Sequence, residues 1–381
     1  MIYLDYQAST PTDPAVIDTV TASMRTRFAN PSAEQHQGGW DAAANLEAAR
    51  VSVARHFCAD HDEITFTSGA TEADNIAIIG AARAAPTERR RILVSAIEHK
   101  AVLEAAAALS GEGFIVELIP VTAQGVVDVE AFSTMVGADV AVISVMAVNN
   151  EIGTIQPIQI LAEIAAGHGS FFHTDATQAP AAIAIDLHDW GVDAASFSSH
   201  KIYGPKGVGA LYVSAVAPWR PRPLMFGGGQ EQGLRPGTVP LALCEGFAQA
   251  VALMVERHWS ESSFVTLLRD RLASGLRARL PNLKVTACLS ARHPGNLHVR
   301  FPDIDADDLL AHLQPAVAAS TGSACTSGII GVSHVLAAIG WTDAEAREAV
   351  RFSLGRFSTE AEVDEAIETI SKAVVALERP K

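Results

Sequence analysis

Residues 171–213, FFHTDATQAPAAIAIDLHDWGVDAASFSSHKIYGPKGVGALYV, indicate the fold class of this chain of 381 residues. The stretch contains three short runs of mostly apolar and small side chains, at residues 171–174, 194–198 and 208–213. Such runs, when they do not alternate regularly between polar and apolar positions, are typical of strands buried on both faces. The stretch therefore predicts neighbouring strands of a covered, mainly parallel sheet.

The same pattern of short strands and intervening helices extends from about residue 60 to residue 215. Four further apolar runs predict strands at residues 64–67, 92–95, 114–119 and 140–145. Alanine-rich stretches between them, such as 72–85 and 100–110, predict helices. We therefore expect an α/β fold with a mainly parallel central sheet and helices on both of its faces.

The pattern changes after about residue 255. Residues 267–280 have the spacing of an amphipathic helix, and apolar and polar residues alternate at 283–289 and 296–301. Capping-box patterns begin helices at Thr342 and Thr359. These signals predict a smaller α+β domain. We expect a large domain at residues 15–255 and a small domain made of residues 1–14 and 256–381.

The charge balance excludes several classes of function. The chain has 28 basic and 43 acidic residues and a net charge of −15, and its longest run of basic residues is only Arg89–Arg91, so direct nucleic-acid binding is not expected. The longest apolar stretches fall short of the roughly 18–20 residues that a membrane helix needs. The first residues, MIYLDYQAST, do not resemble a secretory signal. We expect a cytoplasmic protein that does not enter membranes.

Lysine and cysteine are scarce. The six lysines include Lys201, which directly follows the strand predicted at 194–198 and is preceded by Ser198 and His200. Burial disfavours the charged form of an amine and so prepares it for Schiff-base formation. Ser198 and His200 would hold a phosphate beside it. The other lysines lie in a turn, at a helix start or at positions expected to be exposed.

The four cysteines are widely spaced and form no CxxC pair, which argues against a disulfide framework or a zinc ribbon. Cys58, Cys244 and Cys288 are each expected to be small core side chains. Cys325 differs, because the surrounding STGSACTSG, residues 320–328, is rich in glycine and small polar residues. Such a loop can leave a thiol accessible, as a reactive cysteine requires, although an unreactive loop thiol is the commoner case.

Two strand-to-helix turns carry candidate binding groups. In FTSGATEADN, residues 66–75, free backbone N–H groups and Thr71 could bind a phosphate, but an ordinary capped turn is also compatible. In HTDATQ, Asp175 and Gln178 follow a buried strand and could face a ligand. Asp175 could pair with a protonated ring nitrogen and Gln178 with a phenolate, or the two could simply cap a helix.

Three further features could bind a substrate. His99 could stack on a flat ring or exchange a proton, although lone histidines are more often structural. Arg351 could bind a carboxylate with both nitrogens, although a surface arginine on a strand is more common. The glycine-rich residues 227–238 could bind an anion or simply be flexible. No set of His, Cys, Asp and Glu has convincing metal-ligand spacing, so no metal is expected.

Together these segments resemble the cysteine desulfurases of the iron–sulfur-cluster and nitrogen-fixation type, within the class V aminotransferases. The resemblance implies the pyridoxal-phosphate-dependent transferase fold type I, and it runs nearly from end to end of the chain. It rests on YLDYQASTP, NPSAEQH, TFTSGATEADN, AIEHKAVLE, SVMAVNNEIGTIQPI, FFHTDATQ, SFSSHKIYGPKGVGALYV, GGGQEQGLRPGT, TGSACTSG and VRFSLGRFST.

The resemblance implies pyridoxal 5′-phosphate as cofactor and a role for each matching residue. Lys201 would hold the cofactor and move a substrate proton, assisted by His99. Asp175 would pair with the ring nitrogen and Gln178 with the phenolic oxygen. The substrate carboxylate would be bound by Arg351 and by Asn150, which would also face the cofactor. The phosphate would be held by Ala70, Thr71, Ser198 and His200, and by Thr238 of a partner subunit in a homodimer.

The implied reaction converts L-cysteine to L-alanine. Cys325 would take up the sulfur as a persulfide and pass it to an acceptor protein, either an iron–sulfur scaffold or a thiolation partner. Departures from the family pattern at Pro236, Ser199 and the pair Tyr6–Gln7 remove no reacting group. A selenocysteine lyase or an aminotransferase of the same fold remains an alternative, as does a non-catalytic phosphate-binding protein.

Overall fold

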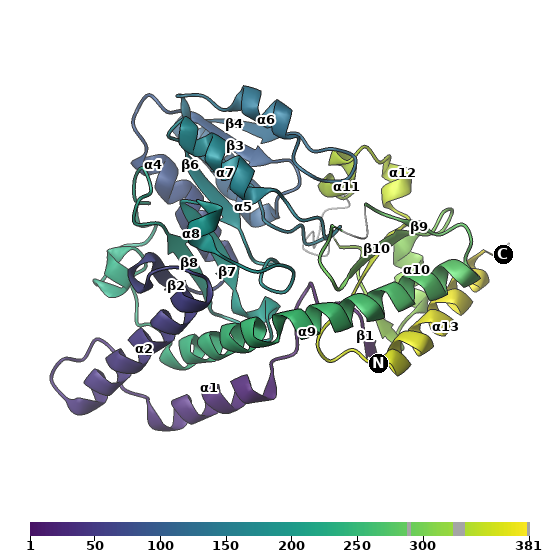
Figure 1. Ribbon diagram of the computed structural model, residues 1–381, viewed down its shortest axis with the longest axis horizontal. Helices are drawn as coiled ribbons and strands as arrows, with labels where there is room; N and C mark the ends of the chain where they lie inside the picture. Colours follow the sequence, from purple (N-terminus) through teal and green to yellow (C-terminus); the bar gives the residue numbers. More distant parts are fainter. Residues whose placement is uncertain (288–290, 323–331, 379–381) are drawn as a thin grey trace.

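The computed structural model describes residues 1–287, 291–322 and 332–378 (Figure 1). Two of the four cysteines, Cys288 and Cys325, lie outside these ranges. The expectation that Cys288 is a core residue and that Cys325 lies in an accessible loop therefore stays a prediction.

A seven-stranded sheet forms the centre of the larger part of the molecule. All seven predicted strands are confirmed, each within one residue of its expected limits. The strand order across the sheet is β2-β8-β7-β6-β5-β3-β4, and every neighbouring pair is parallel except those that involve β8. The bounds are β2 (Ile64–Thr67), β3 (Arg91–Ser95), β4 (Ile115–Ile119), β5 (Val140–Ser144), β6 (Phe171–Asp175), β7 (Ala194–Ser198) and β8 (Gly209–Val213).

Helices cover both faces of this sheet, as the uniformly apolar strands predict. Neighbouring residues of β6 show the arrangement, because Phe171 and Phe172 belong to different buried clusters on opposite faces. One face is covered by α2 (Gln37–His56), α6 (Val129–Met135), α7 (Ile158–Gly167), α8 (Leu187–Trp190) and the first half of α9 (Leu241–Arg279). The other face is covered by α3 (Ala70–Asn75), the π-helical turn Ile76–Gly80, α4 (Ala81–Ala84) and α5 (Lys100–Ala108).

The remaining part of the chain forms a second, smaller α+β layer with its own core. A three-stranded antiparallel sheet of order β12-β10-β9 packs against the second half of α9 and α13. Both predicted capping boxes are confirmed, at the starts of α12 and α13. The bounds are β9 (Lys284–Val285), β10 (Asn296–Arg300), α10 (Ala306–His312), α11 (His334–Ala338), α12 (Asp343–Ala346), β12 (Ala349–Ser353) and α13 (Glu360–Leu377).

The first residues of the chain belong to this second layer. Strand β1 (Ile2–Tyr3) pairs in parallel with β11 (Val317–Ala318), and Leu4 is buried in the same cluster as β12. The chain then crosses to the larger layer, where α1 (Pro14–Thr26) packs against α9. Residues 5–13 therefore connect the two layers, beside the cavity described below.

Helix α9 differs from the sequence expectation, which predicted an amphipathic helix that begins at residue 267 and ends at residue 280. It is one helix of 39 residues, and Figure 1 shows it spanning both layers. Its continuity has a simple cause, since no Gly or Pro stands between Gly246 and Gly275 to interrupt it. Met254 packs in the large core and Val265 in the small one. The domain boundary at residue 255 stays a prediction.

The surface corrects one sequence expectation. Cys58 is exposed rather than a core residue. Helix α2 ends at His56, and Cys58 lies in the following turn with a left-handed backbone, at φ 53°. The helical spacing therefore does not extend to it.

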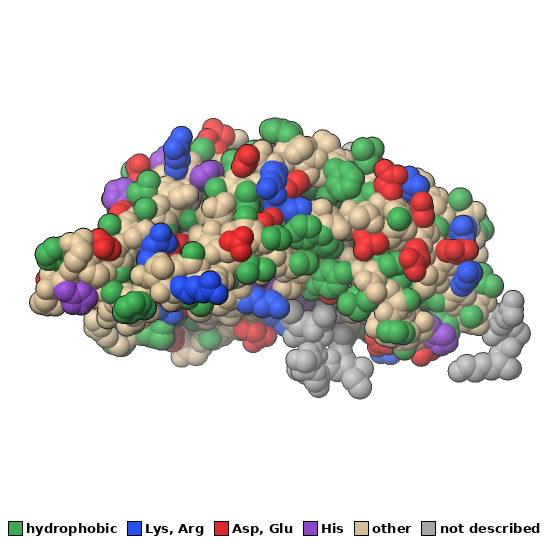
Figure 2. Space-filling model, turned by 90° about the horizontal axis from the view of Figure 1, so that it is seen from below, with side chains coloured by type: hydrophobic (Ala, Val, Ile, Leu, Met, Phe, Trp, Pro, Cys, Tyr) green, Lys and Arg blue, Asp and Glu red, His purple; other side chains and the backbone are tan. Residues whose placement is uncertain are grey.

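Figure 2 shows one face of the molecule, on which acidic and basic side chains are interspersed among apolar ones. Among the described residues, no helix is both long and apolar enough to cross a membrane.

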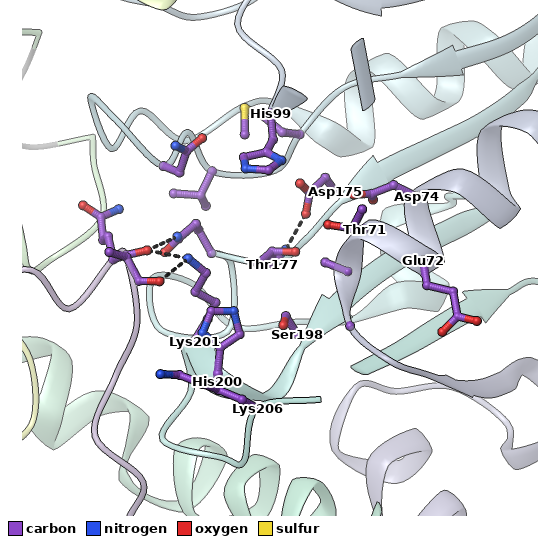
Figure 3. A pocket seen from close by; sticks show the side chains of 18 of the residues that line it. Thr71, Glu72, Asp74, His99, Asp175, Thr177, Ser198, His200, Lys201 and Lys206 are labelled. Atoms are coloured by element: carbon purple, nitrogen blue, oxygen red, sulfur yellow. Dashed lines mark hydrogen bonds between the residues drawn. The ribbon is translucent and has the colours of Figure 1, made fainter. Parts of the chain in front are cut away.

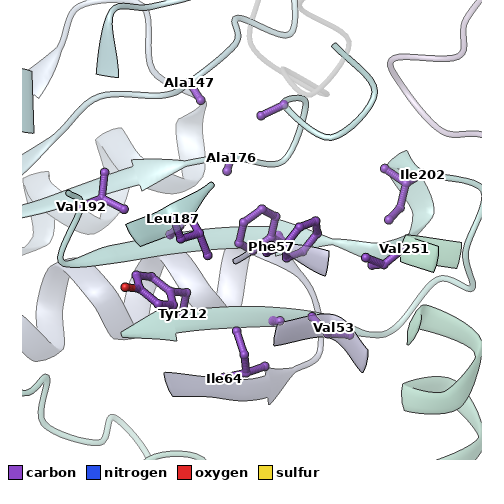
Figure 4. Close-up of a cluster of buried hydrophobic side chains, with 14 of the residues drawn as sticks. Val53, Phe57, Ile64, Ala147, Ala176, Leu187, Val192, Ile202, Tyr212 and Val251 are labelled. Atoms are coloured by element: carbon purple, nitrogen blue, oxygen red, sulfur yellow. The ribbon is translucent and has the colours of Figure 1, made fainter. Parts of the chain in front are cut away.

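The stacking of Phe57 on Phe197 provides a test of the large core. Their ring centroids are 4.3 Å apart at an interplanar angle of 16°, and both side chains are buried (Figure 4). We expect Phe57→Ala to lower the free energy of unfolding by about 3–5 kcal/mol, because it leaves a cavity between α2 and β7. Urea denaturation measures the change. As a control, Val216→Ala at a 90% exposed position should change it by less than about 0.5 kcal/mol. Equal losses in the two variants would contradict this account of the core.

Candidate active site

A cavity of about 450 Å³ lies at the carboxyl ends of the parallel strands, where α/β sheets bind their ligands. Figure 3 shows His99 on one side of it, Lys201 and Ser198 on the other, and Asp175 and Thr177 between them. Ten of the predicted site residues line it: Ala70, Thr71, His99, Asn150, Asp175, Gln178, Ser198, His200, Lys201 and Arg351. The structure thus brings together residues that are up to 281 positions apart, as the difference between Ala70 and Arg351 shows.

The predicted phosphate turn is shaped by a close backbone contact. Gly69 has φ +151°, a conformation that favours glycine, and it directly precedes α3. Gly209, at the start of β8, packs against it so closely that a Cβ there would lie 2.8 Å from Gly69 Cα. Because both glycines lack side chains, the turn can lie against the sheet beside Ser198. The first backbone N–H groups of α3 and the hydroxyls of Thr71 and Ser198 therefore share one end of the cavity.

Lys201 lies in a short 3₁₀ turn, Ser199–Lys201, directly after β7. Its Nζ donates hydrogen bonds to the backbone carbonyls of Gln7, at 2.7 Å, and Ala8, at 2.9 Å. These carbonyls belong to the connection between the two layers. The ammonium group of Lys201 is thus held at the wall of the cavity by backbone dipoles.

His200 is held next to Lys201, and its ring is in the neutral form, with one N–H, at neutral pH. Burial, together with the charges of Lys201 and Lys206, lowers the pKa of His200 to about 4. Its Nδ1 lies 3.2 Å from the hydroxyl of Ser9. A neutral imidazole with one nitrogen available can donate a hydrogen bond to an oxygen anion without adding charge.

Asp175 ends β6, and its Oδ1 accepts a hydrogen bond of 2.9 Å from the backbone N–H of Thr177. Gln178 donates to the carbonyl of Gln7, with 3.0 Å between Nε2 and the oxygen. Asp74 and Glu98 lie behind Asp175 at 1% and 0% exposure. Burial, with the charge of Asp175 as a further contribution, raises the pKa of both carboxyls well above their usual range. Burial therefore favours the protonated, uncharged form of both carboxyls next to Asp175.

His99 caps the start of α5. Its Nδ1 accepts a hydrogen bond of 3.1 Å from the backbone N–H of Ala101. In a neutral ring this contact places the proton on Nε2, because Nδ1 must act as the acceptor. Figure 3 shows the ring at the edge of the cavity, opposite Lys201. The helix cap thus fixes both the orientation of His99 and its tautomer.

Arg351 is 2% exposed on β12, which corrects the view of it as a surface strand residue. Its Nη1 donates to the carbonyl of Asn150 at 2.6 Å. Its Nη2 donates to Asp5 at 2.6 Å and to the hydroxyl of Ser320 at 3.0 Å. Both terminal nitrogens are therefore engaged by protein groups. A carboxylate that binds Arg351 with two hydrogen bonds has to replace some of these partners, and Asp5 is the anionic one.

Two predicted site residues are not found in the cavity. Thr238 is exposed in the loop after the turn Gln230–Gly233, and it does not line the cavity of its own chain. Cys325 lies outside the described residues, although Gly322, three positions before it, lines the cavity.

Sequence reasoning missed the contribution of residues 5–8. The carbonyls of Gln7 and Ala8 hold Lys201, and the carboxylate of Asp5 holds Arg351. Backbone carbonyls have no sequence signature, so no pattern could identify the first contact. Asp5 belongs to the motif YLDYQASTP, so the sequence marked this segment. The motif did not predict that Asp5 pairs with Arg351.

His173 provides a test of the floor of the site. It is fully buried between the hydroxyls of Ser144, at 2.8 Å, and Ser196, at 2.9 Å, and burial lowers its pKa to about 3. An unfolded histidine titrates near 6.5. Between these two values the unfolded state binds the proton more readily, so the stability that the neutral ring contributes is present above pH 6.5 and is lost towards pH 3.

We therefore expect His173→Gln, which keeps a donor and an acceptor, to reduce the loss of stability on acidification. The free energy of unfolding, measured by urea denaturation at about pH 6 and about pH 5, should fall by about 1.4 kcal/mol more in the wild type than in the variant. Carboxyls such as that of Asp193, whose pKa burial raises to about 6, contribute equally to both proteins and cancel. Parallel pH profiles for the two proteins would contradict a neutral buried His173.

Comparisons with known proteins agree with this geometry. Residues 2–366 match the family Aminotransferase class-V. The mitochondrial cysteine desulfurase of Eremothecium gossypii is 44% identical over 373 residues, which are 98% of this chain and 76% of that protein. A solved structure of a NifS-like protein has a TM-score of 0.92 at 36% identity, covering 99% of this chain and 100% of the other. The structure of SspA in complex with cysteine has a TM-score of 0.81 at 33% identity, covering 94% and 100%. The chain belongs to the class-V aminotransferase family and, within it, to the cysteine desulfurases.

Proposed function

We propose that this cysteine desulfurase uses pyridoxal 5′-phosphate bound to Lys201, and that Cys325 takes the sulfur of L-cysteine as a persulfide. One observation carries the proposal: a single cavity gathers a half-buried lysine, a carboxylate at the end of a parallel strand, a histidine with a fixed tautomer and a phosphate-sized turn. The structure of SspA, a relative, is described as a complex with cysteine, which supports this amino acid as the substrate class.

The residues of the cavity fit the cofactor. The N–H groups of Ala70 and Thr71, the hydroxyls of Thr71 and Ser198, and His200 would bind its phosphate. Asp175 would pair with the ring nitrogen, since burial favours the uncharged form of its neighbours Asp74 and Glu98. Gln178 would turn its amide from the carbonyl of Gln7 towards the phenolic oxygen. When bound, the cofactor supplies a sink for the negative charge that develops at the substrate Cα.

The chain itself supplies binding, orientation and proton transfer. Arg351 and Asn150 would hold the substrate carboxylate, and Asp5 would give up one hydrogen bond when it arrives. The amine of Lys201 would take the Cα proton, and Nε2–H of His99 would donate a proton on the opposite side of the cavity. The Cys325 thiolate would form a bond to the substrate sulfur as the carbon–sulfur bond breaks. The electron pair stays with the carbon, which takes up a proton to give alanine.

The persulfide sulfur would pass to an acceptor protein, such as an iron–sulfur scaffold or a thiolation partner. Direct transfer to nucleic acid is not part of the proposal, because the chain carries a net charge of −15 and its longest run of basic residues is only Arg89–Arg91.

Two variants separate the roles of the cofactor and the thiol. Cys325→Ala should keep the yellow colour of the cofactor-bound protein and its spectral response to L-cysteine, but lose at least about 99% of alanine formation, because the sulfur has no nucleophile to receive it. Lys201→Ala should lose both activity and the characteristic absorbance. Absorbance spectra and alanine assays measure the two effects.

Full activity of Cys325→Ala would overturn the role of the thiol. Formation of keto-acid in place of alanine by the wild type would instead indicate an aminotransferase. If the wild-type protein and the Cys325→Ala variant both stay colourless after the cofactor is added, the chain is a binding protein without this chemistry.

We further propose that the active form is a homodimer in which Thr238 completes the phosphate site of the partner subunit. Thr238 is exposed and lies away from the cavity of its own chain. Its loop is nevertheless firmly anchored, because Glu231 forms two hydrogen bonds of 2.7 Å with Arg50 and a third of 2.7 Å with the N–H of Phe66. Arg235 of the same loop pairs with Glu72 at 3.0 Å, next to the phosphate turn.

Mixing two inactive variants tests the shared site. Lys201→Ala lacks the cofactor lysine, and Thr238→Glu places a negative charge beside the partner's phosphate. A heterodimer of the two retains one intact site, so the reassociated mixture should regain about a quarter of wild-type activity. Alanine formation is measured alongside native mass spectrometry, which separates the heterodimer from the two homodimers by mass. Heterodimers without activity would contradict a site shared between subunits.

A further inference from the structure

Asp5 holds the arginine that would bind the substrate carboxylate, although Asp5 is not itself among the residues that line the cavity. Its Oδ1 accepts a hydrogen bond of 2.6 Å from Nη2 of Arg351, and no other described residue donates a hydrogen bond to this carboxylate. Within the described part of the chain, Arg351 forms no second ion pair. The buried cation therefore depends on one anionic partner.

Nη2 of Arg351 is needed in both arrangements in which a guanidinium binds a carboxylate with two hydrogen bonds, either with Nη1 at its end or with Nε along its side. Both N–H groups of Nη2 are already in use, one by Asp5 and the other by the hydroxyl of Ser320 at 3.0 Å. Nε is buried and has no hydrogen-bond partner among the described residues. A carboxylate that binds along Nε and Nη2 would satisfy Nε, but it must first replace Asp5 or Ser320.

Exposure and charge decide that Asp5 is the partner that leaves. The side chain of Asp5 is 19% exposed and that of Arg351 only 3%. A displaced Asp5 carboxylate can therefore be hydrated, whereas a buried guanidinium always needs an anion beside it. Ser320 is neutral and buried, and its hydroxyl also accepts from the N–H of Gly322 at 3.0 Å. Displacing Ser320 instead would leave that N–H unpaired and would bring two carboxylates together at one guanidinium.

The backbone around Asp5 is fixed, so the exchange requires only a rotation of its side chain. Asp5 is bridged to Ser353 of β12, and the N–H of Ser353 donates to the carbonyl of Leu4 at 2.7 Å. Arg351 is held independently, because its Nη1 donates to the carbonyl of Asn150 at 2.6 Å. Asp5 can therefore release Arg351 while the guanidinium keeps its place.

We propose that Asp5 is a positioning residue that competes with the substrate: its carboxylate pairs with Arg351 until an amino acid binds, and the carboxylate of the amino acid then takes its place. The inference rests on the proposed function, because it takes Arg351 as the binding site of the substrate carboxylate. A ligand without a carboxylate cannot displace Asp5, so simple amines gain nothing from Arg351. The competition also lowers the affinity for amino acids, because binding has to break an existing ion pair.

The test measures the binding of L-alanine and of ethylamine to the cofactor-bound, full-length protein, from the spectral change of the cofactor during titration. The two ligands differ only in the carboxylate, and neither carries sulfur for Cys325 to accept. We expect Asp5→Asn, which keeps the shape but removes the competing charge, to bind L-alanine about five- to tenfold more tightly. Ethylamine should bind within about twofold of its wild-type affinity, because it does not use Arg351.

Three further variants separate the effect of charge from other effects. Asp5→Glu keeps a competing carboxylate and should bind L-alanine within about threefold of the wild type. Ser320→Ala removes the neutral partner of the same nitrogen and should not tighten binding. Arg351→Gln should weaken L-alanine binding about tenfold or more. Adding Asp5→Asn to Arg351→Gln should then bring no gain, because the residue through which Asp5 acts is absent.

A crystal structure of the wild type with bound L-alanine carries the test if Asp5→Asn does not fold. The distance between Oδ1 of Asp5 and Nη2 of Arg351 should then exceed the hydrogen-bond limit of about 3.5 Å. The carboxylate of L-alanine should occupy Nη2 in its place.

Unchanged or weaker L-alanine binding by Asp5→Asn would overturn the inference, as would an equal gain for ethylamine or an equal gain in Ser320→Ala. An intact pair of Asp5 and Arg351 in the L-alanine complex would overturn it as well. Failure of the proposed function gives different results. A wild-type protein without any spectral response lacks the cofactor chemistry, and wild-type affinity of Arg351→Gln for L-alanine excludes Arg351 as the carboxylate site.

Discussion

A line of hydrogen bonds across three parallel strands is the constraint on which the site depends. His173 of β6 lies between Ser144 of β5 and Ser196 of β7, and it is hydrogen-bonded to both. The backbone register places these residues at neighbouring positions of the sheet, since Ser144 pairs with His173 and Asp175 pairs with Ser196. Because side chains alternate along a strand, Asp175 points to the same face as His173. Fixing this line therefore fixes where the carboxylate stands.

The floor of the site is consequently rich in polar groups but poor in charge. Burial favours the uncharged form of all three buried groups, because it lowers the pKa of His173 and raises the pKa of Asp74 and of Glu98. A single carboxylate, Asp175, can then act on a cationic ring nitrogen without several buried anions repelling one another. This arrangement has one cause, the loss of water on burial, which raises the pKa of an acid and lowers the pKa of a histidine.

The second layer contributes the residue that is proposed to bind the substrate carboxylate, together with groups that hold the cavity. Arg351 comes from β12, and the connection after β1 supplies Asp5, Gln7 and Ala8, which hold Arg351 and Lys201. Neither layer forms the cavity alone. Helix α9, unbroken across both layers, gives them a common support (Figure 1). A cavity built in this way places Lys201, Arg351 and Gly322 within reach of one small molecule.

The sequence was sufficient to predict those parts of the fold and of the site that depend on local chemistry. Uniformly apolar runs identify all seven strands of the central sheet, because strands covered on both faces have no polar side. The motifs around Lys201 and Asp175 also predict the side chains of the cavity, since polar residues directly after parallel strands meet at one edge. The smaller layer was predicted less completely, because strands as short as β9 and β11 leave little pattern.

Contacts between distant segments could not be predicted. The pairing of Arg351 with Asp5 joins residues 346 positions apart, and a strand pattern cannot show that this arginine is buried. Glu151 stands in a motif that pointed to Asn150, but its contact with Gly322 exists only after both layers have folded. The exposure of Cys58 depends on one left-handed residue beyond a helix end. In each case the deciding interaction is tertiary.

The central claim is that sulfur leaves L-cysteine at this cavity and is received by Cys325. The most direct measurement is mass spectrometry of the peptide containing Cys325 after one turnover with L-cysteine, together with quantification of alanine. The account predicts one additional sulfur atom on Cys325 for each alanine formed, with Cys58 and Cys244 unmodified. Alanine formed with no added sulfur on Cys325, or with the sulfur on another cysteine, would contradict it.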